Sequence, residues 1–508
     1  MKNDYRKEAY YNAIISGACQ VIIIILGFLV PRLFISNYGS NVNGLLGTIS
    51  QIFTYVALIE SGIGAATQNA LYKPIAASDN QRICEILTAS KKYYHKVTDY
   101  YALVVAGMAF VLPFVIKTDV DYWTIVGIVI FEGASGIVNF WFLEHWKMLM
   151  AAEGKQHVIA RIDLVSRVLS YLVKIILAYM MVNIVFIQAG YFVVALIALF
   201  LYRRYIKKQY SWVHYTDADE SIPELKDRNS YVVSDVAWTI FSSTDMVIIS
   251  TIFNTAYASV YSVYNMVYNA LNGLLNSIFN SVAYLLGQTY HRDIKLYQKL
   301  HDSYELIFIA IISILMSCCS VLMIPFIQLY THGVNDVDYI YEFFPLLFGL
   351  VQILSWDRYV SGNLLLIDGK AKRGARYSVV EAFLNVSLSI LLAFLIGLYG
   401  VIIATVVALI YKVVRLTYDA NVLILHRKAW GTLKRIVCNL CVYLSIEIFT
   451  WFHPLEVTSI YGFVVSGFVT VIIVTAYYLT ANFIINHSAM LDAITIVFRR
   501  KNKKGGQA

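Results

Sequence analysis

The chain has 508 residues, of which 59% are hydrophobic and 14% are charged. This composition is too apolar for a water-soluble globular protein and is typical of a chain that lies mostly in lipid. The net charge of +8 is what basic loops beside a membrane give, so it provides no reason to expect a nucleic-acid partner.

Fourteen apolar stretches follow one another along the chain, and most are near the length of about 20 residues that a membrane-spanning helix needs. The eighth stretch is longer than an upright span requires, so we expect that helix to be tilted or bent. We therefore predict an all-α polytopic membrane protein with about 14 transmembrane helices. The expected spans are 12–35, 44–72, 100–116, 122–143, 162–182, 184–202, 231–253, 256–286, 305–330, 342–367, 378–397, 400–418, 437–453 and 459–481.

The basic residues divide the loops into two sets. The N-terminus, the even-numbered loops and the helix ends beside them hold 36 of the 40 Lys and Arg residues, whereas the odd-numbered loops hold only Arg32 and Lys117. By the positive-inside rule the even side is cytoplasmic, and both chain ends lie there. The odd-side loops are only a few residues long and offer no outward domain for catalysis. We therefore predict neither enzyme activity nor a metal or cofactor.

An internal repeat with an offset of 215 residues divides the chain into two halves. It relates Glu153-Gly154-Lys155 to Asp368-Gly369-Lys370, and it relates the turn 37–44 to the turn 252–259. We expect two parallel six-helix repeats with the substrate path between them. A polar stripe is repeated at the same offset, with Ser166, Ser170 and Lys174 matching Glu381, Asn385 and Ser389.

The predicted organisation follows from this repeat and adds two helices to the two halves. Its parts are an N-terminal six-helix half (1–202), a cytoplasmic linker (203–230), a C-terminal six-helix half (231–418), a cytoplasmic loop (419–436), helices 13 and 14 (437–481) and a basic cytoplasmic tail (482–508).

The eighth predicted helix carries a row of amides on one face, with Tyr268 on a neighbouring face. Unpaired amides in hydrocarbon are costly, so the row must face protein or a water-filled cavity. Two interpretations stay open: hydrogen bonds between helices, or a polar lining that contacts a ligand such as a sugar. The amides are Asn265, Asn269, Asn272 and Asn276.

Ionisable residues at membrane depth form the next set of candidates, because each needs a partner or a wet cavity. Arg32, Lys174 and Arg358 would make a cationic lumen for an anionic head group, since guanidinium groups suit phosphate. The alternative is that these residues form structural ion pairs. Glu60 and Asp245 are candidates for ion coupling, with structural pairing again as the alternative.

Several motifs in chain order resemble the polysaccharide transporter family, whose members include the Wzx-type oligosaccharide-lipid flippases. This family belongs to the multidrug/oligosaccharidyl-lipid/polysaccharide exporter superfamily. The motifs are Arg32-Leu33, Ser36-Asn37-Tyr38-Gly39, Asn43-Gly44-Leu45, Glu60-Ser61-Gly62-Ile63-Gly64, Ser243-Thr244-Asp245-Met246 and Tyr261-Ser262.

The resemblance implies a function and a set of partners. Its substrate would be an undecaprenyl-pyrophosphate oligosaccharide, moved by alternating access from the inner to the outer leaflet of the bacterial cytoplasmic membrane. This step serves the synthesis of O-antigen, capsule or exopolysaccharide. Membrane lipids, and the polymerase and glycosyltransferases of the same pathway, are the expected partners.

Three other functions were weighed. A lipid II flippase shares the fourteen helices, and the sequence does not separate it from the first interpretation. A multidrug or cation antiporter of the same superfamily usually has twelve helices and a carboxylate in the first, whereas residues 11–35 contain no Asp or Glu. A polymerase or ligase would need a large outward loop.

Overall fold

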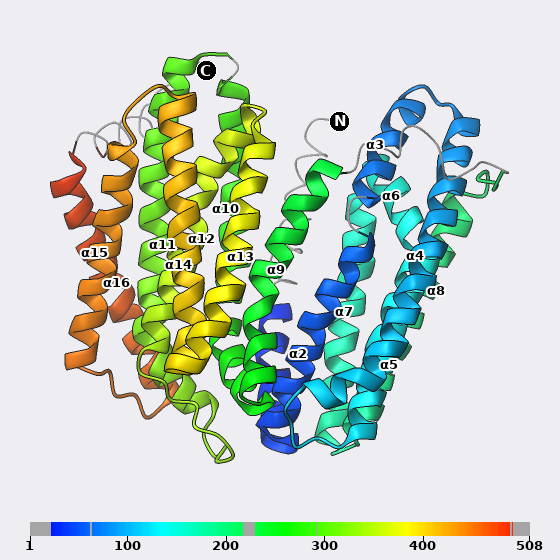
Figure 1. Cartoon of the computed structure of the whole chain (residues 1–508), viewed down its shortest axis with the longest axis horizontal. Coiled ribbons are helices and arrows are strands. Elements are labelled where there is room, and N and C mark those ends of the chain that lie inside the picture. Colours follow the sequence, from blue (N-terminus) through cyan, green and yellow to red (C-terminus); the bar gives the residue numbers. More distant parts are fainter. Residues whose placement is uncertain (1–21, 61–62, 217–228, 291, 488–489, 491–508) are drawn as a thin grey trace, which may run out of the picture. The chain divides into compact units, whose positions relative to one another are not determined.

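The computed structural model describes residues 22–60, 63–216, 229–290, 292–487 and 490. Throughout these ranges the chain is helical apart from short connections, and no strand occurs in them (Figure 1). Nine of the described helices are long and apolar enough to cross a membrane, and two shorter apolar helices, Ile22–Tyr38 and Val236–Ile252, accompany them. The predicted all-α, multi-pass membrane fold is confirmed.

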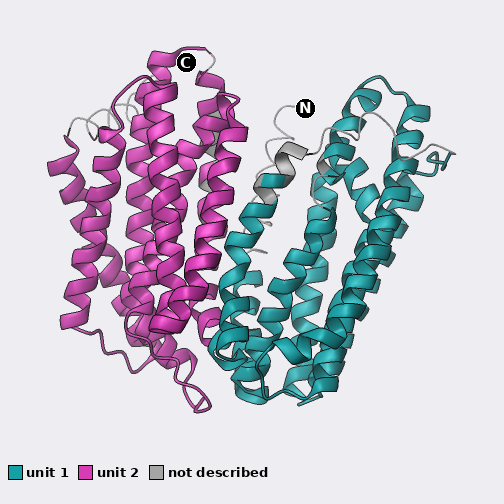
Figure 2. Cartoon of the chain, viewed as in Figure 1, with its two compact units in different colours: residues 1–259 teal, residues 260–508 magenta. Residues whose placement is uncertain are grey.

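Contacts divide the chain into two compact units, residues 1–259 (unit 1) and 260–508 (unit 2), shown in Figure 2. Unit 1 begins with the helix Ile22–Tyr38. Its other elements are α2 (Ser40–Val56), η1 (Ala57–Glu60), α3 (Ile63–Ala76), α4 (Asn80–Val115), α5 (Tyr122–Phe142), α6 (Glu144–Ala152), α7 (Gln156–Tyr179), α8 (Ile184–Gln209) and α9 (Asn229–Ile252).

The boundary between the units falls in the second turn of α10 (Thr255–Tyr290), so most of this helix belongs to unit 2. The division into halves at 203–230 rests on the sequence repeat and stays a prediction. The remaining elements of unit 2 are α11 (Ile294–Tyr330), α12 (Phe344–Ile367), α13 (Ala371–Ile396), α14 (Leu398–Tyr418), η3 (Asp419–Ile424), α15 (Trp430–Phe452) and α16 (Ile460–Ile485).

The helices follow the predicted spans, but α4 and α11 begin well before theirs, at Asn80 and Ile294. Two further differences concern the span 44–72 and a short extra helix. The span expected at 44–72 is two helices, because α2 ends at Val56 and the 3-10 turn η1 follows it before α3 begins. The short helix α6, in a predicted cytoplasmic loop, was not expected. Parts of the predicted first span, the linker and the basic tail lie outside the described residues, namely 12–21, 217–228, 488–489 and 491–508.

Two apolar clusters hold unit 1 together. One joins α2, α4, α5 and α8 through fully buried side chains such as Leu45, Ile128 and Ile187. The other joins α3, α4, α6 and α8 through Leu87 and Tyr202. The helices α4, α5 and α8 contribute residues to both clusters, so they are packed firmly against one another, and α7 packs against α8.

Two turns that the repeat relates meet within unit 1, where α2 packs against the start of α10. The side chain of Asn43 donates a hydrogen bond to Ser259 over 2.7 Å, and Thr255 donates to the side chain of Asn41 over 2.8 Å. Gly44 sits so close that a Cβ atom on it would lie 1.7 Å from the Thr255 carbonyl oxygen. Their sequence separations of 216 and 214 residues nearly equal the repeat offset.

Replacing Gly44 with Ala should destabilise the protein, because the added methyl group meets backbone that no side-chain rotation can move. We expect a loss of at least about 1–3 kcal/mol, the usual cost of overpacking, seen as a lower melting temperature of the purified protein in detergent. Gly107→Ala is the matched control, since nothing lies within 4 Å of a Cβ atom there. Equal melting temperatures for the two variants would contradict the close approach.

Candidate functional site

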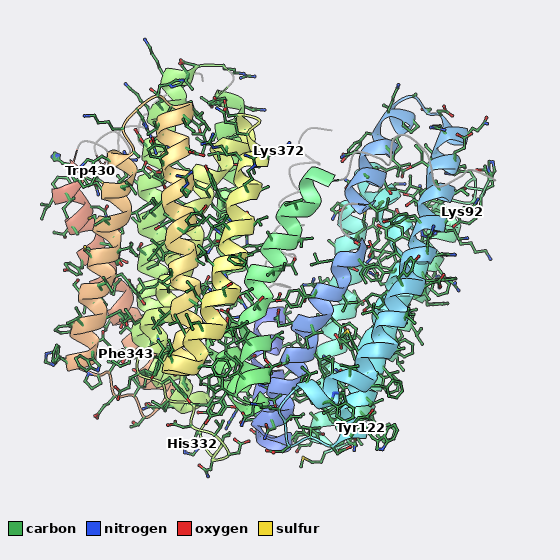
Figure 3. All side chains as sticks on the ribbon, in the orientation of Figure 1. Lys92, Tyr122, His332, Phe343, Lys372 and Trp430 are labelled. Carbon is green, nitrogen blue, oxygen red and sulfur yellow. The ribbon has the colours of Figure 1, made fainter. Side chains whose placement is uncertain are left out.

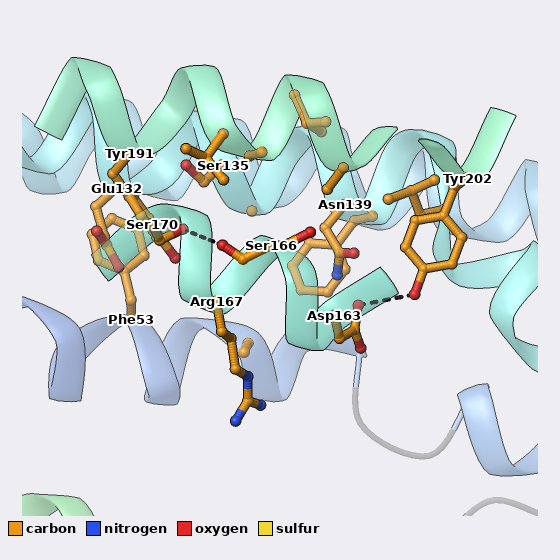
Figure 4. A pocket seen from close by; sticks show the side chains of 18 of the residues that line it. Phe53, Glu132, Ser135, Asn139, Asp163, Ser166, Arg167, Ser170, Tyr191 and Tyr202 are labelled. Carbon is orange, nitrogen blue, oxygen red and sulfur yellow. Dashed lines mark hydrogen bonds between the residues drawn. The ribbon is translucent and has the colours of Figure 1, made fainter. Parts of the chain in front are cut away.

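Unit 1 contains a cavity of about 580 Å³ with polar side chains on several of its walls. The walls come from α2, η1, α4, α5, α6, α7 and α8, and Figure 4 shows many of the lining residues. A concave site with a few convergent polar groups is the usual form of a small-molecule site. The polar and charged lining residues are Glu132, Ser135, Asn139, Lys147, Asp163, Ser166, Arg167, Ser170 and Lys174, with Tyr101, Tyr171, Tyr191 and Tyr202 beside them.

The polar stripe of α7 supplies one wall of the cavity. Ser166, Ser170 and Lys174 are four residues apart, so they lie on one face of the helix. Each serine hydroxyl donates a hydrogen bond of 2.8 Å to the carbonyl four residues before it. The hydroxyl protons are thereby used within α7, and the oxygen lone pairs remain as acceptors on the wall of the cavity.

Most charges in the cavity have a compensating neighbour. The ammonium of Lys174 lies 4.5 Å from the centre of the Tyr191 ring and attracts the carboxylate of Glu132. Tyr202 donates a hydrogen bond of 2.8 Å to Asp163. Lys147 is also paired, through an ion pair of 3.2 Å with Glu144 outside the cavity lining.

Arg167 differs from the other cations of the cavity. Its side chain is exposed and makes no hydrogen bond or ion pair with the described residues. In Figure 4 its guanidinium extends from α7 away from Ser166 and Ser170. The donors and the charge of Arg167 are therefore not used by the described residues. Counted together, Lys147, Arg167 and Lys174 outnumber the carboxylates of Glu132 and Asp163 by one.

The three cations predicted to line a lumen do not share one environment. Lys174 lines the unit 1 cavity, whereas Arg32 is half-buried on the first described helix and is not part of that lining. Arg358 is buried in unit 2, where its guanidinium lies 2.7 Å from Glu381. Lys412 reaches the other oxygen of Glu381 over 2.5 Å. For Arg358 the geometry favours the structural ion-pair alternative, and its role in substrate binding stays a prediction.

The amide row of α10 is used partly for packing within unit 2. The indole of Trp356 donates a hydrogen bond of 2.9 Å to Asn272, which is the interhelical bond that one interpretation expected. Asn272 in turn donates to Asn269 over 3.3 Å, and Asn276 donates to the Asn272 carbonyl over 3.0 Å. Asn269 and Asn276 are exposed on the unit, while Asn265 is half-buried.

Tyr268 is fully buried, stacks on Phe348 and donates its hydroxyl proton to the Pro345 carbonyl over 3.2 Å. The predicted contact of Tyr268 with a substrate therefore has no support from this geometry.

The two candidates for ion coupling both lie in unit 1. One carboxylate oxygen of Glu60 is buried and has no hydrogen-bond partner in the described part of the chain. The nearby charges that act on it are Glu144 and Lys147. Asp245 is buried on α9, beside the hydrogen bond of 2.6 Å that joins Tyr55 and Thr244. The ion-coupling roles of Glu60 and Asp245 stay predictions.

A group of potential metal ligands also converges in the described part of unit 2. His301, Asp302 and Glu305 offer ligand atoms within 4.8 Å of one another. The Asp302 carboxylate, however, lies 2.8 Å from Arg427 and 3.0 Å from Arg435, and Arg435 also pairs with Glu305. Because two guanidinium groups already neutralise these carboxylates, the arrangement does not favour a metal cation.

Comparison with solved structures relates this helix arrangement to known transporters. The lipid II flippase MurJ in an inward closed conformation aligns with a TM-score of 0.71 and 14% identity, over 94% of this chain and all of that one. An inward-facing multidrug resistance MATE family transporter of the MOP superfamily aligns with a TM-score of 0.61 and 12% identity, over 80% of this chain and 98% of that one. The fold is that of these transporters.

A third structure, a MOP superfamily transporter from Pyrococcus furiosus, aligns with a TM-score of 0.52 and 11% identity, over 80% of this chain and 94% of that one. A comparison with protein-family models finds no match, and neither does a comparison with curated proteins. At these identities the structures share an architecture with this chain, and any common substrate has to be argued from the residues.

The α5 wall of the cavity also has a signal in the sequence. Glu132, Ser135 and Asn139 are spaced three and four residues apart on α5, so they lie on one face and line the same cavity as the α7 stripe. Asp163 and Arg167 share a similar spacing on α7. The periodicity of polar residues in two helices of the same half was the available signal for this site.

The Arg358–Glu381–Lys412 network allows a test of whether these buried charges stabilise the fold. Glu381→Gln would leave two buried cations without a counter-charge, and we expect a loss of about 3–5 kcal/mol of stability. Arg358→Met and Lys412→Met each leave one balanced pair and should cost less. Melting temperatures of the three purified variants give the comparison. If Arg358→Met were the most damaging of the three, the charge balance described for this network would be wrong.

Proposed function

We propose that this chain is a flippase for undecaprenyl-pyrophosphate-linked oligosaccharide repeat units. It moves them by alternating access from the inner to the outer leaflet of the bacterial cytoplasmic membrane, for the synthesis of a surface polysaccharide. The observation that carries the proposal is the unit 1 cavity, whose lining combines serine, asparagine and tyrosine side chains with Arg167, an exposed arginine that forms no ion pair with the described residues. A guanidinium suits a pyrophosphate, and hydroxyl and amide groups suit a glycan.

The size of the cavity suits only the head group of the proposed substrate. About 580 Å³ accommodates a small polar head group, but it does not accommodate a long prenyl chain as well. The prenyl chain would therefore stay in an apolar environment. A second cavity of about 590 Å³, within unit 2, has largely apolar walls from α11, α15 and α16 that include Phe449, Ile473 and Val474.

A lipid II flippase is the second candidate, and the structural alignment favours it. The MurJ structure covers 94% of this chain, more than the MATE structure described above does. Lipid II also joins sugars to a prenyl chain through pyrophosphate, so the chemistry of the cavity fits both substrates. A multidrug or cation antiporter is less well supported, because residues 11–35 contain no Asp or Glu, whereas such transporters usually carry a carboxylate in the first helix.

The decisive experiment is deletion of the gene in its native host, followed by leaflet-resolved mass analysis of lipid-linked intermediates. The proposal expects undecaprenyl-pyrophosphate oligosaccharide to accumulate in the inner leaflet and surface polymer to be lost. Accumulation of lipid II with cell lysis would support the second candidate instead. If neither intermediate accumulated and dye efflux fell, the antiporter would take the place of both.

Arg167→Ala should lower transport without lowering the amount of protein in the membrane. Loss of a charge-assisted hydrogen bond to a phosphate removes about 1.5–3 kcal/mol, which corresponds to roughly a 10- to 100-fold weaker interaction. Arg167→Lys keeps the charge and should recover part of the activity. Surface polymer in the complemented deletion strain provides the measurement.

Arg204→Ala is the matched control for this experiment. Arg204 is an exposed arginine of unit 1 that lies on α8 and does not line the cavity. Its replacement should leave the amount of polymer unchanged. Wild-type polymer levels in Arg167→Ala at a normal protein level would remove this residue from the proposed site.

A further inference from the structure

A second feature, in unit 2, concerns cations that the proposed transport cycle does not use. A pocket of about 490 Å³ lies where α13 begins and α14 ends. Lys372, labelled in Figure 3, stands at this end of the unit. The residues that line the pocket are Lys370, Lys372, Arg373, Arg376, Tyr377 and Arg415.

The pocket has more positive charge than its neighbours neutralise. Lys370 pairs with Asp368 and Arg373 pairs with Asp419, each over 2.5 Å. The other cations of the pocket, Lys372, Arg376 and Arg415, form no ion pair with a described carboxylate. Arg415 instead lies over the ring of Tyr377, 5.2 Å from its centre. Three positive charges are therefore uncompensated in one concavity.

The backbone adds to this charge. The helix α13 begins after Lys370 without a side chain that caps its first turn. The N-terminus of a helix carries partial positive charge and unused N–H donors, so the start of α13 and the three cations favour the same kind of ligand, an anion.

The repeat shows that this pocket is more than a general excess of basic residues on the cytoplasmic side. At the same offset, the first half has His157 and Val158 in place of Lys372 and Arg373, and Phe200 in place of Arg415. Some basic residues elsewhere in unit 2 are neutralised, as Arg427 and Arg435 are by Asp302, whereas Arg292 and Lys299 are exposed and lie outside this pocket. The first half thus lacks three of these basic residues, although Lys155 and Arg161 match Lys370 and Arg376.

Apolar surface begins directly beside the pocket. Along α13, Val379, Val380 and Phe383 follow Arg376 within two turns, and all three are exposed, Phe383 to 69%. On α14, Val414 precedes Arg415 and is also exposed. A ligand that follows this surface would be charged at one end and apolar along the rest of its length. Positive loops mark this end as cytoplasmic, so such a ligand would lie in the inner leaflet.

We propose that this pocket binds the phosphate of an anionic phospholipid of the inner leaflet, with the acyl chains against the exposed apolar faces of α13 and α14. Lys372 and Arg376 hold the phosphate, and Arg415 on Tyr377 forms the wall of the pocket. Phosphate is the shared chemistry of other candidate ligands, namely inorganic phosphate and the pyrophosphate of a prenyl-linked sugar. The adjoining apolar surface favours a lipid over a free anion.

The test compares the purified wild-type chain with Lys372→Gln/Arg376→Gln. Each is titrated with mixed micelles of phosphatidylglycerol, and binding is followed by the shift in melting temperature. We expect a shift for the wild-type chain that is lost in the double variant. Phosphatidylcholine and inorganic phosphate should have no effect at the same concentration, and raised salt should weaken the shift.

Arg292→Gln/Lys299→Gln is the matched control, since it removes one exposed arginine and one exposed lysine elsewhere in unit 2. Its shift should equal that of the wild-type chain. An equal shift in the Lys372/Arg376 double variant would overturn the site. A shift produced by inorganic phosphate, or by undecaprenyl phosphate but not by phosphatidylglycerol, would overturn its assignment to a phospholipid.

Should the double variant fail to fold, Arg376→Gln alone is expected to weaken phosphatidylglycerol binding, and an unchanged shift would again overturn the site. None of these measurements depends on transport, so the phospholipid site and the proposed flippase function fail or stand separately.

Discussion

Polar groups inside apolar helices must be satisfied by the protein itself, and this requirement shapes both halves of the chain. The polar stripe that the repeat duplicates satisfies this requirement differently in its two copies. On α13, Glu381 holds Arg358 and Lys412, and Asn385 donates to Thr405 over 2.7 Å. On α7, the corresponding positions open onto a cavity. The copy on α13 is used in contacts between helices, whereas the copy on α7 lines a cavity.

The copy of the stripe on α13 lies beside a close contact between α13 and α14. A Cβ atom on Gly400 would lie 2.2 Å from the carbonyl oxygen of Leu392, so only glycine allows α14 to approach α13 there. Small residues permit close approach of helices in membranes. The repeat position of Gly400 in the first half is Val185, whose side chain packs against Gly127 of α5. The close contact of the second half is therefore not available between α7 and α8 at this position.

The sequence predicts the helices well because each needs only a local apolar run, and every predicted span has a helix in the part of the chain that the structure describes. Partners are less predictable, because a periodic pattern gives the face of a helix and not the residue that faces it. Lys174 and Arg358 look alike as cations within apolar helices. They differ in their partners, because Arg358 donates to Glu381, which is 23 residues away along the chain. The bond from Trp356 to Asn272 spans 84 residues.

The contrast between the halves bears on where a transported anion would be held. Inside unit 2 the described cations of the network around Glu381 are already bound to a carboxylate, so attracting an anion there would mean separating buried ion pairs, which costs several kcal/mol. Arg167 in unit 1 has no such partner to lose. Its exposed guanidinium must be hydrated when the cavity is empty, and an incoming phosphate replaces that water with a charge-assisted contact. Under the proposed function, binding at Arg167 would replace water with a phosphate contact without separating an ion pair, so both binding and release would avoid the cost that the Glu381 network imposes.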